Sequence, residues 1–181
     1  GARVIVIGHI SNSKATERQE SLEPVYKAYT EHIELSFCSE IGTPLSKEQA
    51  ETLQDGQILM LENLRQDPRE KKNDADFARI LADHADVYVN DAFSVAHREH
   101  ASIVGIPQFL PSYIGINFHH EYEELSKMLA PEHPAIFLLG GAKFDTKLPL
   151  VEKFLELYDR VFIGGALVND LFKAKGYEVG T

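Results

Sequence analysis

The segment Ile58-Leu-Met-Leu61-Glu-Asn-Leu-Arg65 joins a short apolar run to a polar turn. Other short runs rich in apolar residues lie at residues 4–7, 33–37, 87–89, 136–139 and 161–163. Such runs are typical of strands that are buried on both faces of a parallel sheet. The chain therefore contains at least six candidate strands, each of which ends at a turn.

The segments between these runs have the spacing of amphipathic helices. Leu22, Val25, Tyr26 and Tyr29 are spaced i, i+3, i+4, i+7, and similar stripes continue from Phe77, Tyr122 and Leu148. Strands that alternate with helices predict an α/β fold, in which a parallel sheet carries helices on both faces in a Rossmann-like, three-layer arrangement. Asn73 or Asp74 is placed to cap the helix that carries Phe77.

The pattern predicts two lobes. Residues 1–118 form the first lobe, residues 119–133 an exposed helix and linker that is ended by prolines, and residues 134–181 the beginning of a second α/β lobe. The second lobe has two predicted strands and two predicted helices, the last at about residues 168–175. So few elements give only a small core of their own.

Composition restricts the possible partners. The 181 residues carry a formal net charge of −10, so the protein as a whole repels nucleic acid and anionic membranes. The single cysteine, Cys38, excludes an internal disulfide, which fits a reducing cytoplasmic compartment. No run approaches the ~20 apolar residues that span a bilayer. We expect a cytoplasmic protein with small-molecule ligands, no nucleic acid and no membrane.

Basic residues follow three of the predicted strands. His9 comes after the first run, Arg65 after the third, and His97 and Arg98 after the fourth. The carboxyl ends of parallel strands share one edge, where ligands bind in open sheets. Guanidinium forks match phosphate oxygens, so this edge suggests a small phosphorylated anion.

A plainer interpretation competes for these basic residues. Arg65 can instead pair with a nearby carboxylate, for which Glu62, Asp67 and Asp91 are available. The charged run at residues 69–72 is predicted to be a solvated loop.

A glycine-rich turn follows the fifth run. Gly140-Gly-Ala-Lys143-Phe-Asp-Thr-Lys147 precedes a helix, and Gly164-Gly165 follows the sixth run. Glycines and a helix N-terminus let the backbone approach phosphates closely, although the Walker A spacing is absent. The alternative is a tight turn with solvated lysines. The histidine pairs at 97 and 100 and at 119 and 120 lack further ligands at metal-site spacing, so no metal site is predicted.

Several of these segments together resemble one family. The matching motifs are Leu61-Glu-Asn-Leu-Arg65, Tyr88-Val-Asn-Asp-Ala-Phe93, Ala96-His-Arg-Glu-His-Ala-Ser-Ile-Val-Gly105 and Leu139-Gly-Gly-Ala-Lys143. In this order they resemble phosphoglycerate kinase, and the resemblance extends along essentially the whole chain. It implies a two-lobed glycolytic kinase that transfers a phosphoryl group between 1,3-bisphosphoglycerate and ADP, giving 3-phosphoglycerate and ATP.

The resemblance also implies roles for individual residues. The 3-phosphoglycerate ligands would be His9, Leu64, Arg65, His97 and Arg98. The residues that bind ADP or ATP would be Gly140, Gly141, Ala142, Lys143, Lys147, Gly164 and Gly165. Lys143 and Arg98 would be the catalytic residues. Mg²⁺ would accompany the nucleotide, and the family's metal-binding Asp is expected beyond residue 181. A monomer is the family expectation.

The sequence departs from the family pattern at residues 11–13. Ser11-Asn12-Ser13 occupies the place where the family has Gly-Arg-Pro, and Asn12 cannot supply the cationic fork of that arginine. The resemblance also begins at the family's second strand and stops early in the nucleotide lobe. We therefore keep two alternatives: a relative that binds a phosphorylated metabolite or nucleotide without turnover, and an unrelated α/β nucleotide-binding module.

Overall fold

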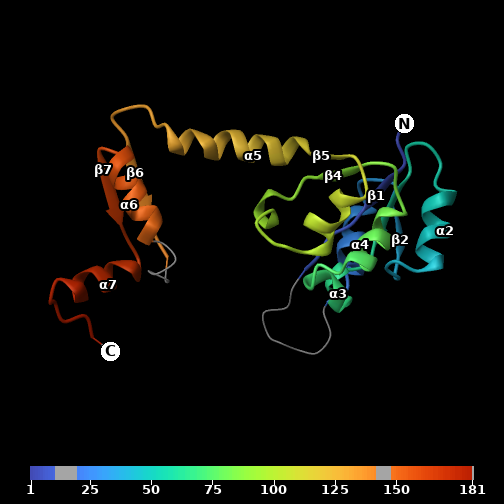
Figure 1. Ribbon diagram of the computed structural model, residues 1–181, viewed down its shortest axis with the longest axis horizontal. Coiled ribbons are helices and arrows are strands. Elements are labelled where there is room, and N and C mark those ends of the chain that lie inside the picture. The colour runs from blue at the N-terminus through green and yellow to red at the C-terminus, as the bar shows by residue number, and fades with distance from the viewer. Residues whose placement is uncertain (11–19, 142–147, 181) are drawn as a thin grey trace. The chain divides into compact units, whose positions relative to one another are not determined.

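The computed structural model describes residues 1–10, 20–141 and 148–180. The chain divides into two compact units, Gly1–His119 and His120–Thr181, and Figure 1 labels their elements. The strands are β1 Val4–Val6, β2 Ser36–Cys38, β3 Ile58–Leu61, β4 Tyr88–Asn90, β5 Ser112–Ile114, β6 Ile136–Leu139 and β7 Arg160–Ile163. The α-helices are α1 Glu23–Tyr29, α2 Pro44–Thr52, α3 Pro68–Lys71, α4 Ala75–Ala82, α5 Ile116–Ser126, α6 Leu148–Leu157 and α7 Leu167–Ala174. Shorter helical turns are η1 Leu64–Gln66, η2 Phe93–Val95, η3 Ala101–Gly105, η4 Ile106–Gln108 and η5 Lys127–Leu129.

The strand pairs in the described residues are all parallel, which confirms the predicted α/β class. In the first unit β3 lies between β1 and β2, with Ile5 opposite Leu59 and Phe37 opposite Met60. A second ladder pairs β4 with β5. The predicted single sheet of this unit is thus described as two separate parallel ladders. The strand β5 was not predicted, because its three residues are all exposed and form no apolar run.

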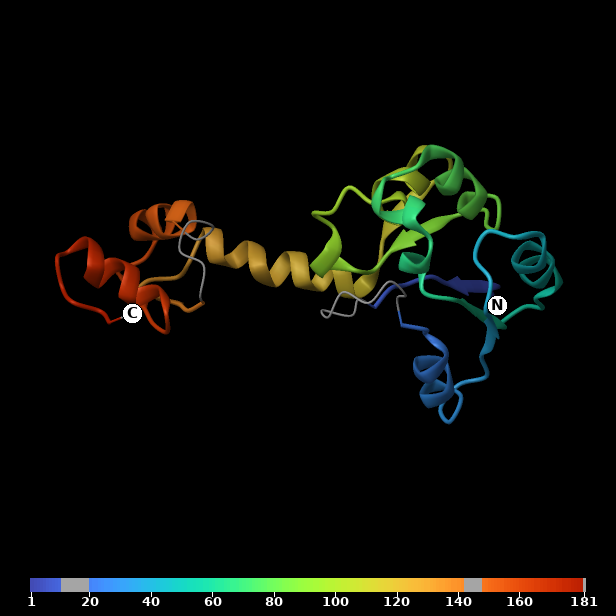
Figure 2. The same ribbon diagram turned by 90° about the horizontal axis from the view of Figure 1, so that it is seen from below.

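Helices cover both faces of the β2–β3–β1 sheet. On one face, Ala50 and Leu53 at the end of α2 pack with Cys38, Leu59 and Leu61. On the other face, the ring of Tyr26 in α1 stacks on Phe37 with centroids 5.2 Å apart. Figure 2 shows α1 (blue) and α2 (cyan) on different sides of these strands. The alternation of side chains along each strand therefore produces the predicted three layers around this sheet.

A second core lies around α4. The Asp74 carboxylate accepts a hydrogen bond from Phe77 N at 2.9 Å, so the predicted cap of this helix is confirmed at Asp74. Phe77 is fully buried and packs in a cluster with Leu64, Leu81 and Ile106. This cluster joins the helix to the turn that follows β3.

The predicted solvated loop at residues 69–72 is wrong. Residues Pro68–Lys71 form helix α3, and Glu70 is fully buried. A run of charged residues normally indicates a solvated surface, but Glu70 receives hydrogen bonds from Ser102, which is 32 residues away in the sequence. Local sequence does not contain that partner.

The second unit contains β6 and β7, which pair in parallel, with α6 packed against them. Its core is a cluster of five buried residues, in which Phe137 and Phe154 have ring centroids 4.1 Å apart. Ile136 and Leu138 remain largely exposed on β6. Only one face of this two-stranded sheet is therefore covered among the described residues.

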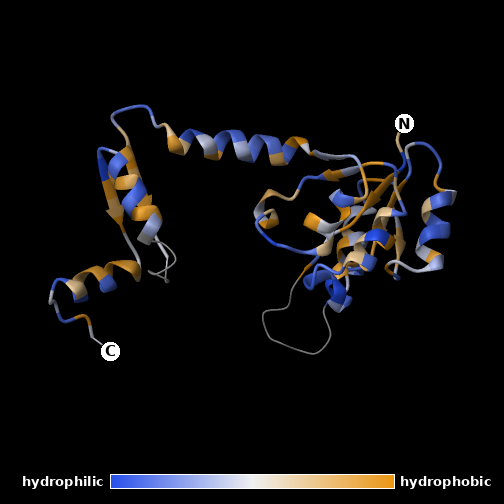
Figure 3. Ribbon diagram, viewed as in Figure 1, coloured by the Kyte–Doolittle hydropathy of each residue, from blue (hydrophilic) through white to orange (hydrophobic). Residues whose placement is uncertain are grey.

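Helix α5 runs across the boundary between the two units and has no buried residues. Figure 3 shows hydrophilic residues along much of its length. Its first turn is attached to the first unit, because Asp91 accepts hydrogen bonds from Phe118 N and Asn117 Nδ2. The limits 119–133 for the linker stay a prediction.

Candidate anion site

Two adjacent strands carry His9 and Arg65 to the same edge of the sheet. Strands β1 and β3 are parallel neighbours, and each residue lies just beyond the carboxyl end of its strand. The turns are joined directly, because Leu64 N donates a hydrogen bond to Gly8 O at 3.1 Å. The predicted convergence of these two residues therefore follows from the strand order.

The turn that carries Arg65 is fixed by buried polar side chains. Asn63 Oδ1 accepts a hydrogen bond from Arg65 N, and Asn63 Nδ2 donates to Ile10 O at 2.9 Å and Glu20 O at 2.7 Å. Asn63 is fully buried, and Arg65 is only 9% exposed. This network holds the backbone of the turn that carries Arg65.

The basic residues influence one another's protonation. The pKa of His9 is lowered from 6.5 to about 4, first by burial and then by the charges of Arg65, Arg98, His100 and Lys71. Burial and Arg98 also lower the pKa of Arg65. Positive groups destabilise each other's charged forms only when they lie close together. The structure therefore gathers His9, Arg65, Arg98, His100 and Lys71 into one site, which we call the basic cluster.

The loop that carries Arg98 reaches this cluster from the end of β4. The rings of His9 and His100 have centroids 6.5 Å apart. The loop is held at Ser102, whose N–H and hydroxyl donate to Glu70 and whose carbonyl accepts from Tyr88 Oη at 2.7 Å. Burial raises the pKa of Tyr88 to about 12, which keeps this donor protonated.

The cluster differs in membership from the set predicted from the sequence. His97 is exposed, and the side chain of Leu64 is buried in the core around Phe77, which leaves its backbone as the part near the turn. His100 and Lys71 were not predicted as site residues. The i, i+3 spacing of His100 from His97 was the available signal for His100. Lys71 was hidden in the charged run that was interpreted as a loop.

The carboxylates proposed as alternative partners of Arg65 are engaged elsewhere. Glu62 accepts hydrogen bonds from Ser21 Oγ, Leu22 N and Asn63 N. Asp67 pairs with Arg69 at 2.7 Å, and Asp91 holds the start of α5. These contacts occupy the three carboxylates named in the plainer interpretation, and Glu70 adds a further negative charge near Arg65.

In the second unit, small turns follow both strands. Gly164 N donates to Leu139 O at 2.8 Å and Leu167 N donates to Gly141 O at 3.2 Å, so the two turns lie side by side. Gly165 has φ +65°, which favours glycine, and a Cβ at Gly140 would meet no atom of the described residues within 4 Å. The described residues therefore leave open space beside the strand ends. Ala142, Lys143 and Lys147, like Asn12 in the first unit, lie outside the described residues.

Three further observations bear on ligands. No group of three or more His, Cys, Asp or Glu side chains that could hold a metal occurs within residues 1–10, 20–141 and 148–180. Nor does any described helix have the length and apolar character needed to cross a bilayer.

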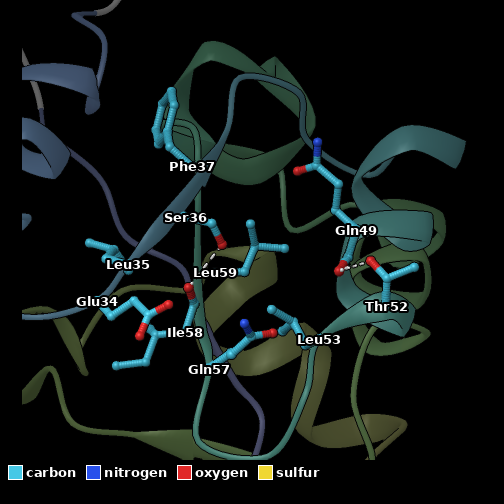
Figure 4. Close-up of a pocket in the computed structure, with 10 residues that line it drawn as sticks. All are labelled: Glu34, Leu35, Ser36, Phe37, Gln49, Thr52, Leu53, Gln57, Ile58 and Leu59. Atoms are coloured by element: carbon cyan, nitrogen blue, oxygen red, sulfur yellow. Dashed lines mark hydrogen bonds between the residues drawn. The ribbon is translucent and has the colours of Figure 1, made fainter.

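A cavity of about 360 Å³ lies at the amino ends of β2 and β3, lined by Ser36, Gln49 and Leu59 among others (Figure 4). The residues lining it include no Lys, Arg or His, so we assign anion binding to the basic cluster at the opposite strand ends.

Comparison with known proteins gives one consistent result. The family model described as "Phosphoglycerate kinase" matches residues 1–181. A phosphoglycerate kinase of Prosthecochloris aestuarii is 42% identical over 187 residues, which cover 100% of this chain and 47% of that protein. One from Chlorobium phaeobacteroides is 44% identical, over 99% of this chain and 47% of that protein. The crystal structure of phosphoglycerate kinase from Pyrococcus horikoshii matches with a TM-score of 0.88 and 29% identity, over 99% of this chain and 47% of that chain. The chain thus spans about half the length of the relatives it matches.

Proposed function

Because the chain belongs to the phosphoglycerate kinase family, we propose that it acts in the reversible transfer of a phosphoryl group between 1,3-bisphosphoglycerate and ADP, giving 3-phosphoglycerate and ATP. The observation that carries the proposal is the basic cluster on a chain of net charge −10. Local positive charge on an acidic protein selects a small anion against larger polyanions. The first unit is therefore the part that binds 3-phosphoglycerate.

The residues of the cluster suit that ligand. Arg65 is largely buried with its backbone held by Asn63, and its fork can bind a carboxylate or phosphate at two oxygens. Arg98 adds a second fork from a different loop. His9 stays neutral at pH 7, because its pKa is about 4, and a neutral imidazole contributes one N–H donor. The cluster thus combines charge with directional donors.

The second unit is proposed to bind the nucleotide. The open space beside Gly140 and the paired turns at Gly141 and Gly164 support this role. Lys143 is proposed to stabilise the phosphoryl group during transfer, since this reaction depends on positioning and on neutralising spread charge. Mg²⁺ is proposed to enter with the nucleotide substrate, as the family resemblance implies.

A second candidate function is binding without turnover. Asn12 stands where the family has an arginine, and it removes one cationic fork from the substrate side. The cluster around Arg65 does not depend on residue 12 for its hydrogen bonds to Asn63, so binding is expected to persist. The two candidates differ only in whether phosphoryl transfer follows.

The experiment that tests the proposal is calorimetric titration of the chain with 3-phosphoglycerate at low and moderate salt. We expect saturable binding that weakens with salt and is lost in an Arg65→Gln variant. Arg3→Gln is the matched control, because Arg3 is exposed and lies outside the cluster. Binding that Arg65→Gln leaves intact would overturn the assignment of the site. A coupled assay of ATP formation then separates the kinase from the binding-only relative.

A further inference from the structure

Glu70 is a buried carboxylate that anchors the loop at Ser102 but is not among the anion-binding residues above. It is fully buried in α3, directly beneath the loop that brings Arg98 and His100 to the cluster. Its Oε1 accepts a hydrogen bond from Ser102 Oγ at 2.6 Å and its Oε2 accepts one from Ser102 N at 3.0 Å. A buried carboxylate is costly unless it is hydrogen-bonded or paired with a positive charge. Two neutral donors satisfy part of that requirement.

The remaining partner of Glu70 is His100. Its Nδ1 lies 3.9 Å from Glu70 Oε1, which is too long for a hydrogen bond. The same nitrogen is buried and has no hydrogen-bond partner among the described residues. A protonated imidazole donates from both nitrogens, and a shift of about 1 Å would make a charge-assisted bond to Glu70. The pair is therefore arranged for a state in which His100 carries a proton.

The surrounding charges decide when that state forms. Burial lowers the pKa of His100, the nearby Glu70 raises it, and the cations Arg65, Arg98 and Lys71 lower it again. The rings of His9 and His100 meet edge to face with centroids 6.5 Å apart, and Tyr88 lies near Glu70. An anion bound to Arg65 and Arg98 offsets the repulsion from those two cations. The carboxylate of Glu70 then favours the protonated form of His100.

We propose that Glu70 is a positioning residue of the anion site, which holds the 97–102 loop and acts as the counter-ion that lets His100 take up a proton when a phosphorylated anion binds. This inference rests on the proposed function, because it takes 3-phosphoglycerate as the anion. It predicts that substrate binding is coupled to proton uptake. The proton comes from solvent, and no covalent bond is made or broken.

The variant Glu70→Gln separates the structural role of Glu70 from its electrostatic role. The amide oxygen can accept from Ser102 N, and the amide nitrogen can donate to Ser102 Oγ, so both anchors of the loop are kept while the charge is lost. Ser102→Ala is the matched control, since it removes one anchor and keeps the charge. A purely structural role predicts the larger effect in Ser102→Ala.

The test is calorimetric titration of the full chain with 3-phosphoglycerate in two buffers of different ionisation enthalpy, which gives the number of protons taken up. A parallel titration uses sulfate, because a phosphate group itself titrates at about pH 6. We expect proton uptake in the parent chain and in Ser102→Ala, and uptake reduced to less than half in Glu70→Gln. Affinity of Glu70→Gln should fall about three- to tenfold at about pH 6.5 and little at about pH 8.5, since one pKa unit corresponds to at most tenfold.

A second measurement is made on the parent chain, and variants serve only to assign its signals. Imidazole NMR signals of the parent chain, assigned with His9→Gln and His100→Gln, should show the pKa of His100 rising when sulfate binds. Binding without proton uptake, or equal uptake in Glu70→Gln, would overturn the role of Glu70 and leave the proposed function standing. Failure of the parent chain to bind either anion would overturn both.

Discussion

Replacement of Glu62 tests how the turn before Arg65 is held. Glu62 is 5% exposed, and its Oε1 accepts hydrogen bonds from Leu22 N at 2.7 Å and Asn63 N at 2.6 Å. In Glu62→Ala both backbone N–H groups lose their acceptor. An unsatisfied buried group costs about 1–3 kcal/mol, so the expected loss of unfolding free energy is about 2–6 kcal/mol.

The matched variant is Glu62→Gln. Its amide oxygen still accepts from both N–H groups, and its amide nitrogen can donate to Ser21 Oγ, which lies 2.6 Å from Glu62 Oε2. Only the charge is lost, so we expect a cost of about 1 kcal/mol. The difference between the two variants separates the hydrogen bonds and volume of the side chain from its charge.

The assay is amide hydrogen exchange combined with urea denaturation. Exchange at Leu22 and Asn63 reports on the first unit by itself, which matters because the chain has two units and a single unfolding transition is not assured. Both amides should be protected in the parent chain and in Glu62→Gln, and should exchange much faster in Glu62→Ala. Equal stability of the two variants would refute the reasoning.

Three further predictions concern the core and the basic cluster. Phe77→Ala should lower the unfolding free energy by about 3–5 kcal/mol, and Phe77→Leu by clearly less, because the fully buried ring leaves a cavity; equal urea midpoints would contradict this. NMR titration of the His9 imidazole should give a pKa of about 4, and Arg98→Gln should raise that pKa. Because the folded pKa lies below the ordinary 6.5, His9 contributes stability above pH 6.5 that is lost as the pH falls toward 4. A pKa at the ordinary value would show that the cluster is not assembled. Arg98→Ala should weaken 3-phosphoglycerate binding by about 1.5–3 kcal/mol, with only part of the loss recovered in Arg98→Lys, and an unchanged dissociation constant would remove Arg98 from the site.

The strands were found where the signal is local. The apolar runs at 4–7, 58–61, 136–139 and 161–163 coincide closely with β1, β3, β6 and β7. A run of consecutive apolar residues is a property of the strand itself, whatever its partner strand is, although β6 and β7 are covered on one face only among the described residues. Among the described residues, strand β5 pairs only with β4, and its three residues are exposed. Its sequence therefore carries no comparable apolar run.

The site was predicted in part for the same reason. His9 and Arg65 follow recognisable strands, and parallel pairing of β1 with β3 brings them together as the topology requires. Glu70 and His100 depend instead on contacts between α3 and the loop after β4. Neither the burial of Glu70 nor the placement of Lys71 follows from the charged run in which they lie.

The sequence by itself therefore determined the α/β class, the family and the basic residues at the strand ends, because periodicity, composition and motif order are properties of consecutive residues. Only the tertiary structure decided which charged side chains are buried and which face one another. That outcome depends on residues such as Glu70 and Ser102, which are far apart along the chain. Their interaction has a large electrostatic effect only because folding removes both from water.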